Sequence, residues 1–414
     1  MPYPKEKGLI FSFTFMAFIL GTTEYVIVGL LSEIAGDFGV TLAAAGILIS
    51  GFALAYAIGT PLILSVLGHL PKRLLLLTGI TLIIVLNMLS AVSTSFAFLM
   101  GTRVVTAILC GLSLSLAISV ASDYVEKARR GRAISYILGG FTIANVFGVP
   151  IGTLVGQHFD WPATFILVSI LGAGALLLNW IYIPRDIPIV NVSAKEQFVL
   201  LTNYRILLAF FIPAMGTAAI FTVFTYITPI MGKVMQLPSS LFSTVLFAYG
   251  LVTIVSNLIG GRIASGDYVG KLRIVFILQA VIFILFGLTA ALPVIGLISL
   301  ILIALTSYIL NASTQLYLID LAYMYVPKAK DFATSLMPVA NNLGIAIGSF
   351  VGGLMIDISG LRALPWVAAG FTFIALVITA VSHRLDRKQG MQMNSNTMRE
   401  EELPASGAHM SSPK

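Results

Sequence analysis

Twelve apolar runs, each about as long as a bilayer core is thick, constrain this chain more than any other feature. A helix needs ~20 mostly apolar residues to cross a membrane. Only 10% of the 414 residues are charged, against about 25% in soluble domains, so the chain is an integral membrane protein. The runs cover residues 8–31, 41–67, 74–93, 96–121, 133–155, 163–183, 205–229, 239–261, 273–291, 294–319, 331–355 and 363–383.

One long polar break divides the runs into two sets of six. It covers residues 184–204, and we interpret it as a cytoplasmic linker. We therefore predict an all-α polytopic membrane protein with six-helix halves at residues 1–183 and 205–383. The chain turns polar over residues 384–414, where we expect a disordered cytoplasmic tail.

The basic residues gather in alternate loops. Of the 24 Lys and Arg residues, only Lys233 and Arg362 fall in the opposite loops, and Arg103 lies inside a run. Because positively charged loops stay in the cytoplasm, both termini are predicted to be cytoplasmic. Membrane orientation thus accounts for the net charge of +7, and we do not expect nucleic acid as a partner.

A glycine pattern recurs in the two halves at a constant offset of 196 residues. Glycines at this spacing let two helices approach closely in lipid, so packing is their simplest role. The shared offset implies two halves built on one template, and transporters of that kind bind substrate between the repeats. The matching residues are Asn145, Gly148, Gly152 and Gly156 in the fifth run, and Asn341, Gly344, Gly348 and Gly352 in the eleventh.

Three motifs resemble the major facilitator superfamily, and the likeness covers all twelve runs. The fifth run, from Gly148 through Pro150 and Gly152 to Gly156, resembles the antiporter motif of drug:proton exporters. Arg103 with Gly111 resembles the intramembrane arginine motif of the family, although Ala107 replaces the usual glycine. Residues 22–31 resemble the first span of bacterial sugar-efflux and arabinose-efflux-like exporters. The resemblance implies twelve helices in two pseudo-symmetric halves.

The loop after the second run departs from the family pattern. The family usually carries a glycine, an aspartate and several basic residues there, whereas this chain has Gly59, Lys72 and Arg73 without the aspartate. The matching loop of the second half keeps Arg262 and Asp267. The resemblance implies that both loops gate the cytoplasmic side through charge contacts, and the first loop lacks its acid.

Glu24 is the one charged residue between Lys7 and Glu33. An acid in an apolar run is costly unless it is protonated, paired or facing water. Glu24 lies seven residues, or ~10 Å, from the outer end of its helix, and Arg103 lies at a similar depth in the fourth run. We predict that these two residues couple transport to protons: Glu24 takes up a proton from outside, and Arg103 or a cationic substrate influences its release. A purely structural ion pair is the alternative.

Polar and aromatic side chains inside the runs predict a mostly apolar pocket with scattered hydrogen-bonding groups, as small-molecule sites often have. Interhelical hydrogen bonding is the alternative role for each of them. The expected cavity residues are Tyr25, Phe52, Tyr56, Asn145, Phe221, Thr225, Tyr226, Tyr249, Asn311, Gln315, Asn341 and Asn342.

These features predict a proton-coupled antiporter of the bacterial inner membrane. It would export a small amphipathic molecule such as a drug, sugar or nucleoside by alternating access. The alternatives are a proton-coupled importer or facilitator, and a non-transporting membrane sensor; the antiporter-type motif favours export. Without a G-x-x-x-x-G-K-[ST] motif we expect neither an enzyme nor an ATP-driven pump. No metal or cofactor is expected, and the partners are a small-molecule substrate, protons and the lipid bilayer, with the chain as a monomer.

Overall fold

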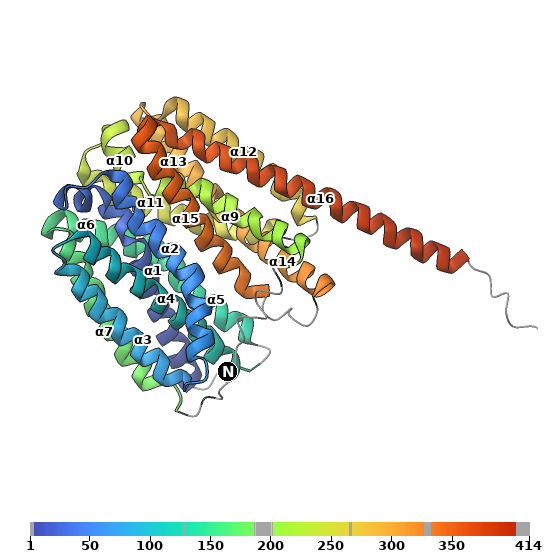
Figure 1. Cartoon of the computed structure of the whole chain (residues 1–414), viewed down its shortest axis with the longest axis horizontal. Coiled ribbons are helices and arrows are strands. Elements are labelled where there is room, and N and C mark those ends of the chain that lie inside the picture. Colours follow the sequence, from blue (N-terminus) through green and yellow to red (C-terminus); the bar gives the residue numbers. More distant parts are fainter. Residues whose placement is uncertain are drawn as a thin grey trace, which may run out of the picture.

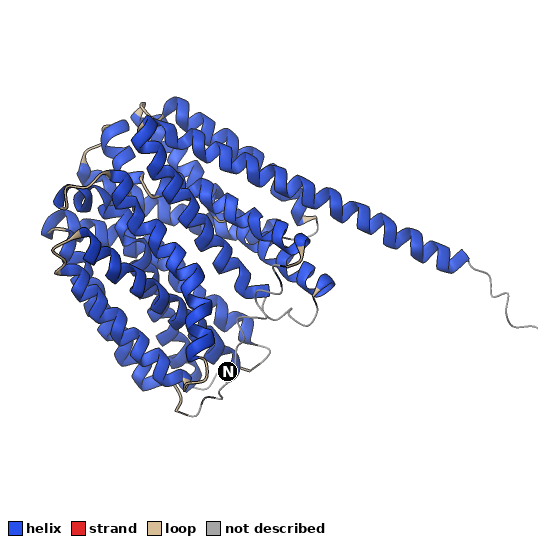
Figure 2. Ribbon diagram, viewed as in Figure 1, coloured by secondary structure: helices blue, strands red, loops and turns tan. Residues whose placement is uncertain are grey.

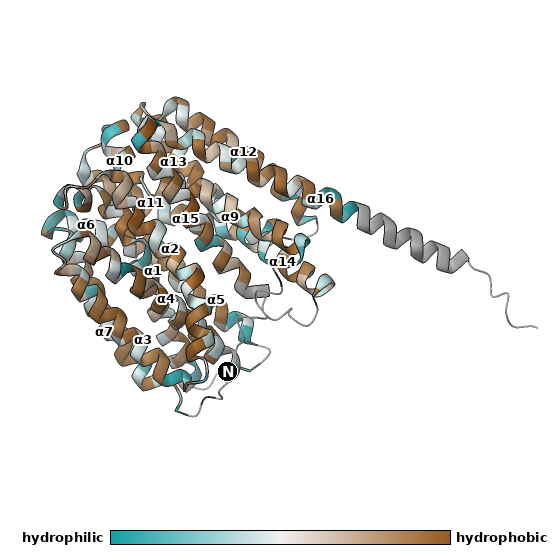
Figure 3. Ribbon diagram, in the orientation of Figure 1, coloured by the Kyte–Doolittle hydropathy of each residue, from teal (hydrophilic) through white to brown (hydrophobic). Residues whose placement is uncertain are grey.

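The computed structural model describes residues 4–126, 129–185, 187, 200, 202–264, 267–326 and 333–402, and over these residues it consists of helices and loops (Figure 2). Twelve helical spans of the described chain are long and apolar enough to cross a membrane, which confirms the predicted all-α fold. The helices are apolar along most of their length (Figure 3). Large apolar side chains also remain exposed on their surface, as expected of a face covered by lipid.

The first half forms six spans, coloured blue to green in Figure 1. Its fifth span is divided into α5 (Arg130–Ile143), the π-helix η2 (Ala144–Gly148) and α6 (Val149–Phe159). Pro150 has no N–H to donate to the carbonyl of Val146, and the wider turn accommodates this lost bond. The other spans are α1 (Pro4–Asp37), α2 (Leu42–Leu67), α3 (Lys72–Ala91), α4 (Phe96–Tyr124) and α7 (Trp161–Tyr182).

The second half has two helix breaks where the sequence predicts unbroken runs. The seventh run, expected to reach residue 229, ends with α9 (Tyr204–Phe224), and the chain continues as α10 (Ile227–Pro229) and η3 (Ile230–Val234). The tenth run divides into α13 (Pro293–Ser307) and α14 (Ile309–Tyr325) at Tyr308, whose N–H donates to Oγ of Ser256 at 2.9 Å. The remaining helices are η4 (Ser239–Leu241), α11 (Phe242–Ile263), α12 (Tyr268–Thr289), α15 (Ala333–Ser359), η6 (Leu361–Ala363) and α16 (Leu364–Glu402).

The last helix extends beyond the predicted end of the twelfth run. The sequence predicts a disordered tail from residue 384, whereas α16 continues to Glu402 and projects from the bundle (Figure 1). No proline interrupts this stretch before Pro404, and its arginine, glutamine, methionine and glutamate residues favour a helix. Asp386 also accepts hydrogen bonds from Arg205 and from the hydroxyl of Tyr317, which anchors the first turn of the extension. Most of the predicted 184–204 linker lies outside the described residues.

The two halves share a hydrophobic core at only one end of the bundle. One cluster of buried residues contains Val26 to Ala35 of the first half together with Ala219 to Met235 of the second. At the end that carries the chain termini, each half instead has a core of its own. At the shared end Thr228 Oγ1 donates to the carbonyl of Val28 at 3.1 Å. The halves are therefore closed on each other at the end remote from the termini.

Candidate functional site

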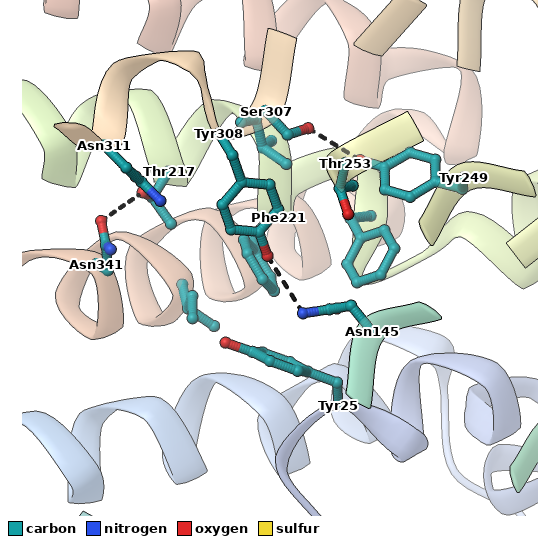
Figure 4. A pocket seen from close by; sticks show the side chains of 13 residues that line it. Tyr25, Asn145, Thr217, Phe221, Tyr249, Thr253, Ser307, Tyr308, Asn311 and Asn341 are labelled. Carbon is teal, nitrogen blue, oxygen red and sulfur yellow. Dashed lines mark hydrogen bonds between the residues drawn. The ribbon is translucent and has the colours of Figure 1, made fainter. Parts of the chain in front are cut away.

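A small cavity lies between the two halves near the middle of the spans (Figure 4). Its volume is about 50 Å³, which has room for a few water molecules. A solute of drug or sugar size therefore requires the halves to move apart. The cavity is lined by Tyr25, Asn145, Thr217, Ile220, Phe221, Phe224, Tyr249, Thr253, Ser307, Tyr308, Asn311, Asn341 and Ile345.

Six of the twelve residues expected to form a cavity line this one. They come from both halves, and Tyr25 of α1 meets Phe221 of α9 with ring centroids 6.0 Å apart. Thr217 Oγ1 donates to Asn341 Oδ1 at 3.1 Å, so this amide is held within the second half. The six are Tyr25, Asn145, Phe221, Tyr249, Asn311 and Asn341.

The other six expected residues lie outside the lining. Thr225 and Tyr226 both bind Ser349 of α15, and Oη of Tyr226 also contacts Gly46 of α2 across the two halves. Gly46 is required there because a Cβ would overlap Oη of Tyr226. These two residues thus help to close the shared end of the bundle.

The remaining four also lack a place in the cavity wall. Asn342 donates to the carbonyl of Pro338 on its own helix at 3.2 Å, and Gln315 is half-buried on α14. Phe52 and Tyr56 of α2 are buried next to Arg103 and Glu24, described below.

Tyr308 is the main lining residue that the sequence analysis did not identify. Asn145 Nδ2 donates to its hydroxyl at 3.3 Å, and this bond joins the π-helix of the first half to the helix break of the second (Figure 4). The neighbouring Ser307 hydroxyl pairs with Tyr249 Oη at 3.2 Å. The adjacent polar pair Ser307-Tyr308 within a strongly apolar run was the available signal in the sequence.

Glu24 and Arg103 are both buried, with 5% and 0% of their surface exposed. Arg103 donates to backbone carbonyls of α1, from Nη1 to Thr23 at 2.8 Å and from Nη2 to Glu24 at 3.3 Å. Its guanidinium also lies 4.2 Å from the ring centre of Phe52. The structure thus brings the two residues together, but the arginine holds the α1 backbone rather than the Glu24 carboxylate.

The Glu24 carboxyl group is only partly satisfied. Its Oε1 is buried and has no hydrogen-bond partner in the part of the chain that the structure describes. Tyr25, Tyr56 and Tyr308 lie within electrostatic range of the carboxyl. Tyr25 and Tyr308 also line the cavity, so two lining residues interact electrostatically with this carboxyl.

Both glycine ridges pack against the first helix of their own half. A Cβ on Gly148, Gly152 or Gly156 would overlap side chains of α1, namely Thr22, Val26 and Leu30. These three positions are spaced four residues apart and flank Glu24. In the second half, Gly344, Gly348 and Gly352 face the backbone and side chains of α9 in the same way. The antiporter-type motif therefore brings the fifth span close to the helix that carries the buried acid.

Lys72, which follows the loop after α2, pairs with a carboxylate from another helix. Lys72 Nζ pairs with Asp123 of α4 at 2.6 Å and donates to Ser119 Oγ at 2.9 Å. Asp123, in the last turn of α4, was not identified from the sequence as the partner of Lys72. Arg73 donates to the carbonyls of Ile183 and Trp180 at the end of α7.

Of the other expected gate residues, Asp267 and Gly59 make contacts within their own half. Asp267 caps α12 by accepting from the N–H of Gly270 at 2.8 Å, and its carboxylate lies 3.8 Å from Nδ1 of His383. Gly59 lies against Ile108 where α2 packs on α4, and Arg262 is in the last turn of α11. Among the described residues, no group of three or more His, Cys, Asp or Glu side chains could hold a metal ion.

Comparisons with known proteins agree with this architecture. The sequence matches the Major Facilitator Superfamily over residues 13–324. It is 32% identical to an uncharacterized MFS-type transporter, YtbD of Bacillus subtilis, over 90% of this chain and 94% of that one. It is 25% identical to a probable sugar efflux transporter of Helicobacter pylori over 89% of this chain and 93% of that one. A bacterial homologue of the human lysosomal transporter Spinster, solved in an inward-facing and occupied conformation, has a TM-score of 0.74 and 15% identity over 93% and 98% of the two chains.

The chain therefore belongs to the Major Facilitator Superfamily. It is a twelve-span membrane transporter and not an enzyme, as the sequence analysis predicts.

Proposed function

We propose that this protein is a proton-coupled antiporter that exports a small amphipathic solute through a bacterial inner membrane. The observation that carries the proposal is the buried Glu24, whose Oε1 has no hydrogen-bond partner among the described residues, while Arg103 is held by the adjacent backbone. A carboxylate locked in a bidentate arginine pair would be stabilised in its charged form. Glu24 is free of such a pair, so it can exchange a proton without a buried salt bridge being broken.

The position of Glu24 links its protonation to the solute. Tyr25 and Tyr308 line the cavity and lie within electrostatic range of the carboxyl, and each belongs to a different half. A solute that separates these two tyrosines would change the polarity around Glu24. Movement of the halves would then favour proton uptake in one state and release in the other.

The proposed direction of access follows from the closed end of the bundle. The basic loops favour a cytoplasmic position for both termini, which would put the shared hydrophobic core on the outer side. In this orientation the halves have separate cores on the cytoplasmic side, from which an exporter takes its solute. Aromatic rings with amide and hydroxyl groups suit a drug, sugar or nucleoside, and the similarity to a probable sugar efflux transporter supports a solute of this size.

The test is transport in everted membrane vesicles with ethidium, arabinose and uridine as probes of the three solute classes. The wild-type protein should collapse an imposed pH gradient with at least one probe. Glu24→Gln should abolish this response while the protein still inserts and unfolds at a similar temperature. Glu33→Gln is the matched control, because it removes a carboxylate from the outer end of the same helix.

Each negative result has a defined meaning. Transport by Glu24→Gln at the wild-type rate would contradict proton coupling through this residue. Net uptake of probe into intact cells under an inward proton gradient would identify the importer. The absence of any response from the wild-type protein to probes of all three classes would contradict export and favour a sensor.

A further inference from the structure

A second cavity, of about 450 Å³, opens at the end of the first half that carries the N-terminus. It lies between α1 and α5, and its volume falls within the ~300–1,000 Å³ that is usual for small-molecule sites. The central cavity is far smaller, so the second cavity, unlike the central one, can hold a whole solute in the described conformation. Its lining consists of Glu6, Lys7, Ile10, Phe11, Thr14, Arg129, Arg132, Ala133 and Tyr136.

Positive charge is in excess around this cavity. Arg129 is shared between two acids, Glu6 at 3.3 Å and Glu126 at 3.0 Å. Lys7 and Arg132 form no ion pair within the described part of the chain, and both side chains are exposed. Two cationic groups at the cavity are therefore available for an anion.

Much of the remaining cavity wall is apolar. Ile10, Phe11, Ala133 and Tyr136 form an apolar surface, and Phe11 and Tyr136 are 59% and 57% exposed. Basic residues near a membrane surface often serve only to orient the chain, and aromatic residues often lie at the interface. Neither role requires basic and aromatic side chains to line the same cavity, as they do here.

The cavity is aligned with the central cavity along one helix. Lys7, Phe11, Thr14 and Phe18 precede Tyr25 at spacings of four, three, four and seven residues, so they share one face of α1. Lys7 and Tyr25 are 18 residues apart, which is ~27 Å along a helix. The same face of α1 thus lines both cavities.

We propose that this second cavity is an entry site for an amphipathic organic anion, with an acidic head held by Lys7 and Arg132 and an apolar body against Phe11 and Tyr136. An anionic phospholipid offers the same chemistry, but the continuity with the Tyr25 face of α1 favours the transported solute. The inference names a solute class for the proposed exporter and rests on that proposal. Its test is a binding measurement without a pH gradient, so a failure of proton coupling leaves the result unchanged.

The experiment measures hexyl phosphate binding to the full-length protein in neutral phosphatidylcholine nanodiscs by isothermal titration calorimetry. The wild-type protein should bind hexyl phosphate and should bind hexanol and hexyltrimethylammonium much more weakly. The double variant Lys7→Gln/Arg132→Gln should lose affinity on the order of tenfold or more, since each basic group near a membrane surface contributes about 1 kcal/mol to binding an anion.

Arg384→Gln/Arg387→Gln is the matched control, because it removes two exposed positive charges from α16 and leaves the cavity intact. Equal loss of affinity in the two double variants would overturn the site, as would equal binding of hexanol and hexyl phosphate by the wild type. Nanodiscs that also contain phosphatidylglycerol identify the occupant. Unchanged binding of hexyl phosphate supports a soluble anion as the occupant. Competition by phosphatidylglycerol overturns this assignment and identifies the cavity as a lipid-binding site.

Discussion

The two halves have the same glycine packing but differ in charge at corresponding positions. The offset of 196 residues that relates the glycine ridges also relates Tyr25 to Phe221, and these two rings meet in the cavity. At the same offset, Glu24 corresponds to Ile220 and Arg103 to Ser299. The repeat therefore duplicated the helix packing, whereas Glu24 and Arg103 have no charged counterparts at the corresponding positions of the second half.

The fifth and eleventh spans also differ in regularity. The fifth contains the π-helix η2, which presents Asn145 to Tyr308 of the other half, whereas α15 is continuous from Ala333 to Ser359. Gly148 faces the side chain of Thr22, whereas its counterpart Gly344 faces the backbone carbonyl of Ala214, and the next ridge glycine, Gly348, faces that of Ala218. π-Helical turns inside α-helices are frequent at functional sites. The comparison suggests that the fifth span is adjustable and that the eleventh span is its rigid counterpart.

Removal of the buried cation should have the largest effect. Arg103→Met deletes two hydrogen bonds from a charged donor to the α1 backbone, each of which contributes about 1.5–3 kcal/mol. We expect a large fall in unfolding temperature and loss of pH-driven transport. Ser299→Ala, at the corresponding place in the second half, should change transport less than about twofold, because it removes only an uncharged hydroxyl. Thermal unfolding of purified protein and vesicle transport test both variants. Equal effects of the two would show that the halves share the chemistry.

Substitution of the ridge glycines should have an intermediate effect. Gly348→Ala forces a methyl group onto a backbone carbonyl and should cost about 1–3 kcal/mol through overpacking. Gly148→Ala should cost less than this, because the Thr22 side chain can change rotamer. Gly101→Ala on α4 is the control, since a Cβ there would meet no neighbouring atom within 4 Å. The measurement is the shift in unfolding temperature. A larger shift for Gly148→Ala than for Gly348→Ala would reverse the assignment of the rigid span.

Loss of the hydrogen bond between Asn145 and Tyr308 should have the smallest effect on stability. Asn145→Ala, Tyr308→Phe and the double variant form a cycle whose coupling free energy should be about 0.5–1.5 kcal/mol. Tyr249→Phe is the control, because Tyr249 bonds to Ser307 within the second half. Tyr308→Phe should change the rate of transport, whereas Tyr249→Phe should change only the stability. Zero coupling between Asn145 and Tyr308 would mean that this bond does not hold the halves together.

The fold was more predictable than the site. Apolar runs of membrane length were sufficient to predict the twelve spans, because lipid leaves few alternatives to a helix. The 196-residue offset was sufficient to predict their repeat. The helix breaks at η2 and Tyr308 were not predicted, since the same apolar residues suit a straight or a broken helix. Only half of the expected cavity residues line the cavity. The other half could not be excluded from the sequence, because polarity and span number do not specify which face of a helix meets its neighbour.

The sequence by itself determined the membrane class, the pairing of the two halves and the similar depth of Glu24 and Arg103, since each depends on spacing along a helix. Only the tertiary structure decided what these residues contact. Arg103 holds backbone carbonyls and leaves Oε1 of Glu24 unpaired, and Asp123 provides the acid missing from the loop of Lys72. These contacts depend on the rotation and separation of neighbouring helices, which the packing of the whole bundle sets.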